Sequence, residues 1–403
     1  MQPLTSARAK PVLPYAGVYR LVDFPLSNCV HSRLSDVWVV EQFQSFSLNE
    51  HLVNGRPWDL DRTYGGLRII PPSKGGNGDG WAEGNADAIY RNISLVRDFA
   101  PDIIVVASAD HVYRLDYRDV IDAHRARDAS VTAVTTTLPP GESASRYGVV
   151  QVGSDGRITG FAYKPDRPTG RTVTTELFVY DATTLLDTLD ALAGEEEGDD
   201  DAEGLKDFGH KLLPRLVDAG SAYAVPLDGY WRDVGVVESY WQSHMDLLAP
   251  EPPFRLDDPA WPILTFGTQR VPARLHASAE VTNSLVSPGC DVRGRVVRSV
   301  LGPGVVVEEG AEVRDAVIFH EAVIRRGAHV GRAVLDSEVE VARDATVGAS
   351  GVADSAGGAD AGGIAVVGRG ARLDVGTITP AGARIEPADA RRGATPERHK
   401  KTV

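Results

Sequence analysis

Cysteine is almost absent from the sequence: Cys29 and Cys290 are the only two among 403 residues. Two cysteines exclude a disulfide scaffold, and neither has the spacing of a cysteine-based metal site. So little cysteine is typical of proteins from a reducing compartment. Apolar runs of about 18 residues, the length of a membrane-spanning helix, are also missing, and the first residues lack the apolar stretch of a signal peptide. We therefore expect a cytoplasmic protein that has no membrane partner.

Basic residues are outnumbered, with 42 Lys and Arg against 56 Asp and Glu and a net charge of −14. Because phosphate backbones bind to basic surfaces, this balance disfavours nucleic acid as a main partner, and we expect none. The serine-hydrolase pattern GxSxG and the zinc-protease pattern HExxH are absent as well. The apolar and charged fractions, 42% and 24%, are those of a globular protein. The length predicts two or three domains.

The first 250 residues alternate between strand and helix patterns. An apolar run at Ile103–Ala107 predicts a strand, and residues 116–128 predict the helix that follows it. Residues 130–138 predict the next strand, and VWVV at 37–40 predicts an earlier one. A strand, a helix and a second strand at this spacing are typical of βαβ units. The sequence therefore predicts an α/β domain with a mostly parallel sheet.

From about residue 280 the sequence becomes rich in valine and glycine and repeats every 17 residues. Four parallel series keep this period: Val296, Val313, Val330 and Val347; Val300, Val317 and Val334; Leu301, Ile318 and Leu335; and Val307, Ile324 and Val341. Three short strands make one coil of this length, and stacked coils bury their aliphatic residues against each other. The repeat predicts a parallel β-helix, with a globular β-domain of chance spacing as the alternative.

The domain organisation follows from the change between the strand and helix patterns of the first 250 residues and the repeat that begins near residue 280. Five prolines fall within residues 249–262, which indicates a domain boundary. We predict an α/β domain at 1–248, a linker at 249–279, a β-helix domain at 280–385 and a mobile tail at 386–403.

Four residues have the chemistry and setting of a phosphate site. Asp110 follows the strand at 103–107, at the sheet edge where ligands bind in α/β folds, and its carboxylate suits Mg²⁺. Asp233, in GYWRDVG, offers a second metal oxygen. Lys10 and Lys164 each precede a proline, which favours extended backbone and fixes a lysine in a loop that faces a phosphate. The alternatives are a helix cap or turn for Asp110, a surface turn for Asp233 and solvent exposure for both lysines.

A set of motifs carries a more specific signal. These motifs, in chain order, are PLTSARAKPVLPYAG (3–17), RLVDFPLSNCVHS (20–32), VVEQFQSFSLNEHL (39–52), EGNADAIYRN (83–92), SADHVYRLDY (108–117), RYGVV (146–150), YKP (163–165), DFGHKLLP (207–214) and YWRDVG (230–235). In order and spacing, residues 1 to about 350 resemble the ADP-glucose pyrophosphorylase (glucose-1-phosphate adenylyltransferase) family of bacteria and plants.

The resemblance implies a fold and a reaction. The fold is a Rossmann-like nucleotidyltransferase domain followed by a left-handed parallel β-helix of hexapeptide-type repeats. In the reaction, ATP and glucose 1-phosphate give ADP-glucose and pyrophosphate for glycogen or other α-glucan synthesis. The implied cofactor is Mg²⁺, and the implied partners include a small-molecule effector and further copies of the chain, in a homotetramer by analogy.

The resemblance also implies roles for particular residues. Asp110 and Asp233 match the metal ligands, and Asp110 and Lys10 match catalytic positions. The implied substrate-binding positions are Gln42 and Gly84 for the nucleotide, and Gly148, Tyr163, Lys164 and Thr174 for the sugar phosphate.

The sugar pocket departs from the family pattern. Tyr163 stands where the family has a glutamate that accepts hydrogen bonds from sugar hydroxyls, and a neutral phenol does not accept as an anion does. Thr174 and Glu176 align with the serine and glycine of the family motif SMG. A different sugar 1-phosphate therefore stays open as the acceptor.

The family also has a strand and a loop, GGxGxRL, before the PLT motif, whereas this sequence begins at Met1. We expect a misassigned start, with a non-catalytic regulatory paralogue as the alternative. The β-helix taken alone resembles hexapeptide acyltransferases, which use a histidine base. His320 and His329 are the candidates, and we expect both to face solvent.

Overall fold

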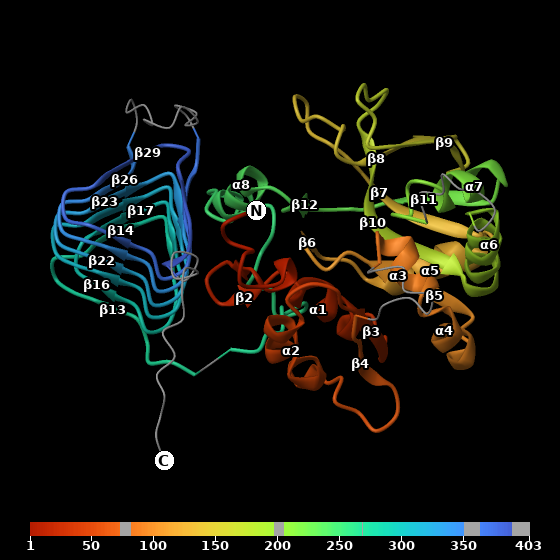
Figure 1. Cartoon of the computed structure of the whole chain (residues 1–403), viewed down its shortest axis with the longest axis horizontal. Coiled ribbons are helices and arrows are strands. Elements are labelled where there is room, and N and C mark those ends of the chain that lie inside the picture. The colour runs from red at the N-terminus through yellow and green to blue at the C-terminus, as the bar shows by residue number, and fades with distance from the viewer. Residues whose placement is uncertain (73–81, 197–204, 268, 350–362, 389–403) are drawn as a thin grey trace, which may run out of the picture. The chain divides into compact units, whose positions relative to one another are not determined.

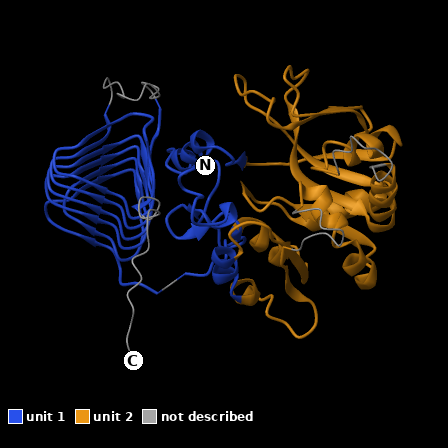
Figure 2. Ribbon diagram, viewed as in Figure 1, with its two compact units in different colours: residues 1–23, 46–53, 232–403 blue, residues 24–45, 54–231 orange. Residues whose placement is uncertain are grey.

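The computed structural model describes residues 1–72, 82–196, 205–267, 269–349 and 363–388. The chain forms two compact units, which Figure 2 distinguishes by colour. Unit 2 comprises Phe24–Ser45 and Asn54–Trp231, and unit 1 comprises Met1–Asp23, Phe46–Val53 and Arg232–Val403. The boundary that we expect at residue 248 stays a prediction, and most of the tail expected at 386–403 lies outside the described residues. No helix within the described part of the chain is long and apolar enough to span a membrane.

Unit 2 contains an α/β sheet with helices on both faces. Its elements are α1 (Asp23–His31), β3 (Asp36–Val40), η2 (Val53–Trp58), β4 (Gly66–Ile70), α3 (Asn85–Tyr90), α4 (Ile93–Phe99), β5 (Ile103–Ala107), β6 (His111–Tyr113), α5 (Tyr117–Ala126), β7 (Val131–Thr137), β8 (Gly148–Val152), β9 (Ile158–Tyr163), β10 (Thr172–Asp181), α6 (Ala182–Glu196), α7 (Leu212–Asp218) and β11 (Ala222–Pro226). Strand β12 (Trp231–Asp233) begins at the last residue of this unit.

The main sheet has the order β11-β7-β10-β8-β9, and β5 also pairs with β10. Strands β5, β7 and β8 each run antiparallel to β10, so these three share one direction, and β11 is parallel to β7. Strand β9 runs antiparallel to β8, and β3 is parallel to β4 in a separate pair. The mainly parallel direction predicted from the sequence is confirmed for β5, β7, β8 and β11, whereas β9 and β10 run the opposite way.

Alternating side chains of the central strands fill two cores. Phe178 and Tyr180 of β10 pack in one cluster with leucines of α6 and α7. Leu177 and Val179 point to the other face, where they pack with Tyr117 of α5. Figure 1 shows these helices around the sheet. A strand covered on both faces needs a continuous apolar sequence, which explains the run at β5.

Unit 1 contains a second fold and a small helical core. Its elements are η1 (Lys10–Val12), β1 (Pro14–Tyr15), β2 (Tyr19–Arg20), α2 (Ser45–Leu52), α8 (Val237–Asp246), β13 (Arg274–Leu275), β14 (Glu280–Thr282), β15 (Leu285–Val286), β16 (Asp291–Val292), β17 (Arg295–Val297), β18 (Val300–Leu301), β19 (Val306–Val307), β20 (Glu312–Arg314), β21 (Val317–Ile318), β22 (Val323–Ile324), β23 (His329–Gly331), β24 (Ala333–Leu335), β25 (Glu340–Val341), β26 (Thr346–Ala349), β27 (Ala365–Val367), β28 (Arg372–Leu373), β29 (Ile378–Pro380) and β30 (Arg384–Ile385).

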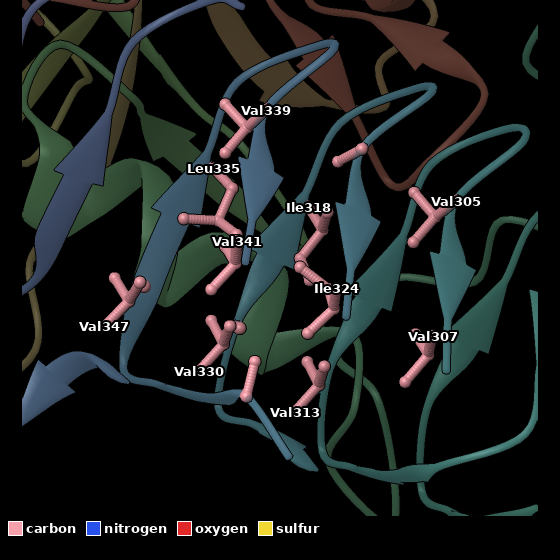
Figure 3. Close-up of a cluster of buried hydrophobic side chains, with 14 of the residues drawn as sticks. Val305, Val307, Val313, Ile318, Ile324, Val330, Leu335, Val339, Val341 and Val347 are labelled. Atoms are coloured by element: carbon pink, nitrogen blue, oxygen red, sulfur yellow. The ribbon is translucent and has the colours of Figure 1, made fainter. Parts of the chain in front are cut away.

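Strands β13 to β30 form three parallel sheets of six strands each, in which every third strand is a neighbour. The residues that share the 17-residue period are register partners across successive coils: Val296 pairs with Val313, Val313 with Val330 and Val330 with Val347. Their side chains belong to one buried cluster in the interior, where Figure 3 shows Val313, Val330 and Val347. The β-helix predicted from the repeat is confirmed, in the left-handed hexapeptide form that the resemblance implies.

His244 belongs to helix α8 of unit 1 and is fully buried. The Ala16 N–H donates to His244 Nε2 at 3.1 Å, and His244 Nδ1 lies 2.8 Å from the Tyr240 carbonyl oxygen. Since Nε2 accepts, Nδ1 carries the proton and donates to Tyr240, and the ring is neutral. Burial lowers the pKa of His244 to about 4.

This histidine is expected to make the protein less stable in acid. Because the native pKa lies below the ordinary value, the unfolded chain takes up the proton first, and stability falls between pH 6.5 and about 4. The contribution of His244 to this fall is about 3 kcal/mol in the free energy of unfolding. Urea unfolding at several pH values measures it, with His244→Gln as the comparison. An equally steep pH slope in the variant would contradict the assignment.

Candidate active site

Asp110 lies in the turn that follows the carboxyl end of β5. Its Oδ1 accepts a hydrogen bond from Ser108 Oγ at 2.5 Å and lies 3.7 Å from His111 Nε2. The side chain is 19% exposed, so it is reachable from solvent. The helix-cap alternative for Asp110 is excluded, because the next helix, α5, is capped by the side chain of Asp116. A carboxylate at this edge of the sheet fits the sequence prediction of a ligand site.

Sequence reasoning gave no role to His111, which is buried beside Asp110. Its Nδ1 lies 3.0 Å from the Thr175 carbonyl oxygen, so Nδ1–H donates to that oxygen and Nε2 is directed toward Asp110. The Trp231 ring contacts the imidazole edge-on, with 5.3 Å between ring centres. These contacts fix the ring beside the carboxylate. In the sequence, the signal that could have pointed to His111 is its position directly after Asp110.

The two nucleotide candidates, Gln42 and Gly84, also lie in unit 2. Gln42 Nε2 donates to the Ala82 carbonyl oxygen at 2.5 Å. Gly84 has a φ of 150°, and a Cβ there would lie 2.3 Å from the backbone of Lys206. A side chain at residue 84 would therefore push the two segments apart. The structure thus brings the motifs EGNADAIYRN and DFGHKLLP together.

The sugar-phosphate candidates meet on β8, β9 and β10. Gly148 is the register partner of Tyr163, and a Cβ at Gly148 would lie 2.8 Å from Thr174 Oγ1. Lys164 Nζ lies 4.5 Å from the centre of the Tyr163 ring. All four predicted residues are therefore neighbours.

The backbone expectation for the two lysines is wrong. Lys164 has a φ of 44°, in the left-handed region, and its N–H donates to the Tyr147 carbonyl oxygen at 3.0 Å. Lys10 begins the short helix η1 instead of an extended segment. The preference that the following proline imposes is overridden at Lys164 by the backbone bond to Tyr147, beside the β8–β9 pairing. At Lys10 it is overridden by a short turn in which the Leu13 N–H donates to the Lys10 carbonyl oxygen at 3.0 Å.

Asp207 is a second residue that sequence reasoning missed, although it belongs to the quoted motif DFGHKLLP. Its Oδ2 accepts from the Tyr163 hydroxyl at 2.8 Å and lies 3.9 Å from Lys164 Nζ. Its Oδ1 accepts from the Asn85 N–H at 3.2 Å. One carboxylate therefore ties the sugar-phosphate candidates to the segment that follows Gly84.

The loop of Asp110 is joined to the sugar-phosphate candidates through β10. The Ser108 N–H donates to the Glu176 carbonyl oxygen at 3.2 Å, and His111 is bound to the neighbouring Thr175 carbonyl. Thr174, one residue earlier, faces Gly148. The segment 174–176 therefore connects the candidate metal carboxylate with the sugar-phosphate candidates.

Lys10 and Asp233 belong to unit 1. Lys10 is half-buried at the start of η1. Asp233 ends β12, and its Oδ1 accepts from the Gly235 N–H at 2.7 Å. That these two side chains share one site with Asp110 stays a prediction.

The described residues suit a magnesium ion that binds together with the phosphates of the substrate. Among the residues that the structure describes, no group of three or more His, Cys, Asp or Glu side chains is arranged to hold a metal. Mg²⁺ in nucleotide sites typically uses one or two carboxylates, with water and phosphate oxygens as the other ligands. The accessible carboxylate of Asp110 suits this kind of binding.

Comparisons with known proteins agree with both folds. The family model described as "Nucleotidyl transferase" matches residues 1–249, and the model described as "GlmU-like, C-terminal hexapeptide" matches residues 268–367. A protein of Pseudothermotoga lettingae named glucose-1-phosphate adenylyltransferase is 40% identical over 311 residues, which cover 77% of this chain and 72% of the relative. Proteins of the same name from Thermosipho africanus and Clostridium perfringens are each 38% identical. They cover 77% and 78% of this chain, and 74% and 80% of their own lengths. The chain therefore belongs to the glucose-1-phosphate adenylyltransferase family of nucleotidyl transferases.

Proposed function

We propose that the protein joins ATP and glucose 1-phosphate to give ADP-glucose and pyrophosphate, for the synthesis of glycogen or a related α-glucan. The observation that carries this proposal is the connection through residues 174–176. This segment bonds to the loop of Asp110 on one side and faces Gly148 on the other. A carboxylate suited to Mg²⁺ next to polar residues suited to a sugar is the arrangement that transfer of a nucleotidyl group to a sugar phosphate requires.

The reaction requires little covalent chemistry from the protein itself. A phosphate oxygen of the sugar 1-phosphate attacks the α-phosphate of ATP in line, and pyrophosphate leaves. The attacking oxygen is already ionised, so no general base is needed. Catalysis then consists of holding the two phosphates together and neutralising their charge.

Particular side chains suit these tasks. Asp110 and Asp233 would hold Mg²⁺, which supplies positive charge to the phosphates when bound. Lys10 and Lys164 would add positive charge at the ATP and the sugar phosphate. Gln42 and Gly84 would contact the nucleotide. Tyr163 and Thr174 would contact the sugar.

The test is an assay of the protein purified from its own cells with ATP, Mg²⁺ and a panel of hexose 1-phosphates. We expect ADP-glucose and pyrophosphate in equal amounts, with kcat/KM for glucose 1-phosphate at least about 10-fold above the others, the discrimination of roughly one lost polar contact. Preference for another hexose 1-phosphate would overturn the choice of sugar. Binding of the substrates without turnover of any of them would favour the regulatory subunit.

An anionic effector forms part of the proposal. Burial, and after it the nearby arginines Arg20, Arg8 and Arg369 of unit 1, lower the pKa of His320 to about 4. Arg8 Nη1 is buried and has no hydrogen-bond partner among the described residues. A phosphorylated metabolite that changes KM or kcat would support an effector site in the protein. Loss of that change in the variant Arg8→Ala would place the site at these arginines.

The homotetramer and the cytoplasmic location complete the proposal. ATP and sugar phosphates are metabolites of the cytoplasm, and the sequence carries only two cysteines. Light scattering on the purified protein tests the tetramer, which a monomer mass of 43.2 kDa would exclude.

A further inference from the structure

Glu176 holds a backbone conformation that disfavours glutamate. Its φ is 52°, in the left-handed region, where a residue with a Cβ is strained. It lies at the centre of a bulge of β10, because Thr174 pairs with Thr135 whereas Phe178 pairs with Ala133. Glycine would fit this position without strain. A strained residue that persists next to a candidate site calls for a functional reason.

The surroundings of Glu176 supply that reason. The carboxylate of Glu176 is near enough to Tyr163 to be among the charges that raise the pKa of its phenol, after burial and Asp207. Lys164, next to Tyr163, is also in the left-handed region. Two strained residues, one from β10 and one just after β9, therefore flank the same ring.

Tyr163 is fixed in place and cannot act as an acceptor anion. Its hydroxyl donates to Asp207, its ring lies 4.8 Å from that of His210, and a Cβ at Gly209 would lie 2.0 Å from it. The Lys164 ammonium covers the ring at 4.5 Å. The raised pKa of the phenol keeps it neutral at physiological pH. Tyr163 is therefore a rigid wall, and a charged acceptor for sugar hydroxyls must come from another residue.

We propose that Glu176, on the bulge of β10, is the specificity-determining carboxylate that accepts hydrogen bonds from the sugar hydroxyl groups of the hexose 1-phosphate, with Tyr163 as a neighbouring uncharged wall of that site. The proposal rests on the proposed function and names a residue for it. A carboxylate binds two neighbouring hydroxyl groups at once, and such charge-assisted bonds are about twice as strong as neutral ones. The family pattern has a glutamate at the position of Tyr163 and a glycine at the position of Glu176. In this chain the carboxylate stands at residue 176 and an uncharged residue stands at 163, so the acceptor has moved from one position to the other.

The variant Glu176→Gly should lower the affinity for glucose 1-phosphate without lowering the stability of the protein. We expect its affinity for glucose 1-phosphate to fall by about 10- to 100-fold, because a charge-assisted hydrogen bond is lost. The KM for ATP should not change. The melting temperature should stay the same or rise, since glycine relieves the strain at φ 52°. Calorimetric titration with glucose 1-phosphate and the two KM values measure these effects.

Asp128→Gly provides the matched control. Asp128 is exposed in the same unit and has a φ of 48°, so glycine relieves the same kind of strain there. This variant should keep the wild-type affinity for glucose 1-phosphate. In the double variant Tyr163→Glu with Glu176→Gly, the carboxylate returns to residue 163, and we expect at least a tenfold recovery of affinity over Glu176→Gly, about one charge-assisted bond.

The outcomes keep the two proposals apart. If wild-type protein neither binds nor converts glucose 1-phosphate, the proposed function fails. If wild-type protein binds it and Glu176→Gly binds it equally well, the role of Glu176 is wrong and the proposed function stands. A double variant no better than Glu176→Gly would overturn the exchange between residues 163 and 176.

Discussion

Asp110→Asn is expected to lower the formation of ADP-glucose by about 1,000-fold or more, while the melting temperature changes little. The amide has the shape of the carboxylate, and its oxygen still accepts the hydrogen bond from Ser108 Oγ. What is lost is one negative charge at the place where Mg²⁺ would bind between protein and phosphates. A single group that stabilises charge in the transition state contributes a factor of about 10² to 10³, and failure to hold the metal adds to that loss. Pyrophosphate release at saturating substrates measures the change.

The same strand provides the control. Asp102 precedes β5 at its opposite end and is exposed, so Asp102→Asn removes an equal charge far along the strand. We expect its turnover to stay within about twofold of the wild type, as for most surface substitutions. An Asp110→Asn protein that keeps more than a tenth of the activity would show that Asp110 does not hold the metal.

The parts of the fold that were predictable rest on local or periodic signals. The run Ile103–Ala107 became β5 with the expected bounds, because one strand needs only a continuous apolar segment. The helix expected at 116–128 became α5, with Asp116 as its cap. The valine and isoleucine series specified the β-helix, since each coil repeats the same contact with the next.

The contacts within the candidate site were not predictable from such signals. Tyr163 and Asp207 lie 44 positions apart, and Asn85 and Asp207 lie 122 apart. Their meeting depends on the order and direction of the strands in the sheet, including the reversed and bulged strand β10. The motifs identified which segments matter, but the partner of each side chain came only from the folded chain.

His320 shows the same limit in the β-helix. The expectation that it faces solvent is wrong: it is largely buried and its Nδ1 lies 3.0 Å from Ser337 Oγ. The repeat predicts the position of a residue within its coil. It does not predict which other segment of the chain packs on the outside of that coil. Here Arg8, from the N-terminal segment, lies over the neighbouring Phe319 ring at 5.8 Å. His329, by contrast, is 58% exposed as expected.

The contact between the N-terminal segment and the β-helix predicts the largest change in stability. Arg8 Nη2 bonds to Asp336 Oδ1 at 2.8 Å, and the two side chains are only 11% and 2% exposed. Asp336→Ala leaves the Arg8 guanidinium buried without its counter-charge, near the positive charge of Arg20. We expect the free energy of unfolding to fall by about 3–5 kcal/mol, the usual loss when one partner of a buried ion pair is removed. Urea unfolding followed by circular dichroism measures it.

An exposed ion pair from the same coil is the control. Glu338 bonds to Arg369 at 2.7 Å, but these side chains are 50% and 46% exposed. Glu338→Ala should therefore cost less than about 1 kcal/mol. Replacing both buried partners, as in Arg8→Met with Asp336→Leu, should cost less than Asp336→Ala alone, because no charge is left without a partner. If Asp336→Ala costs no more than Glu338→Ala, then the pair does not hold the N-terminal segment on the β-helix.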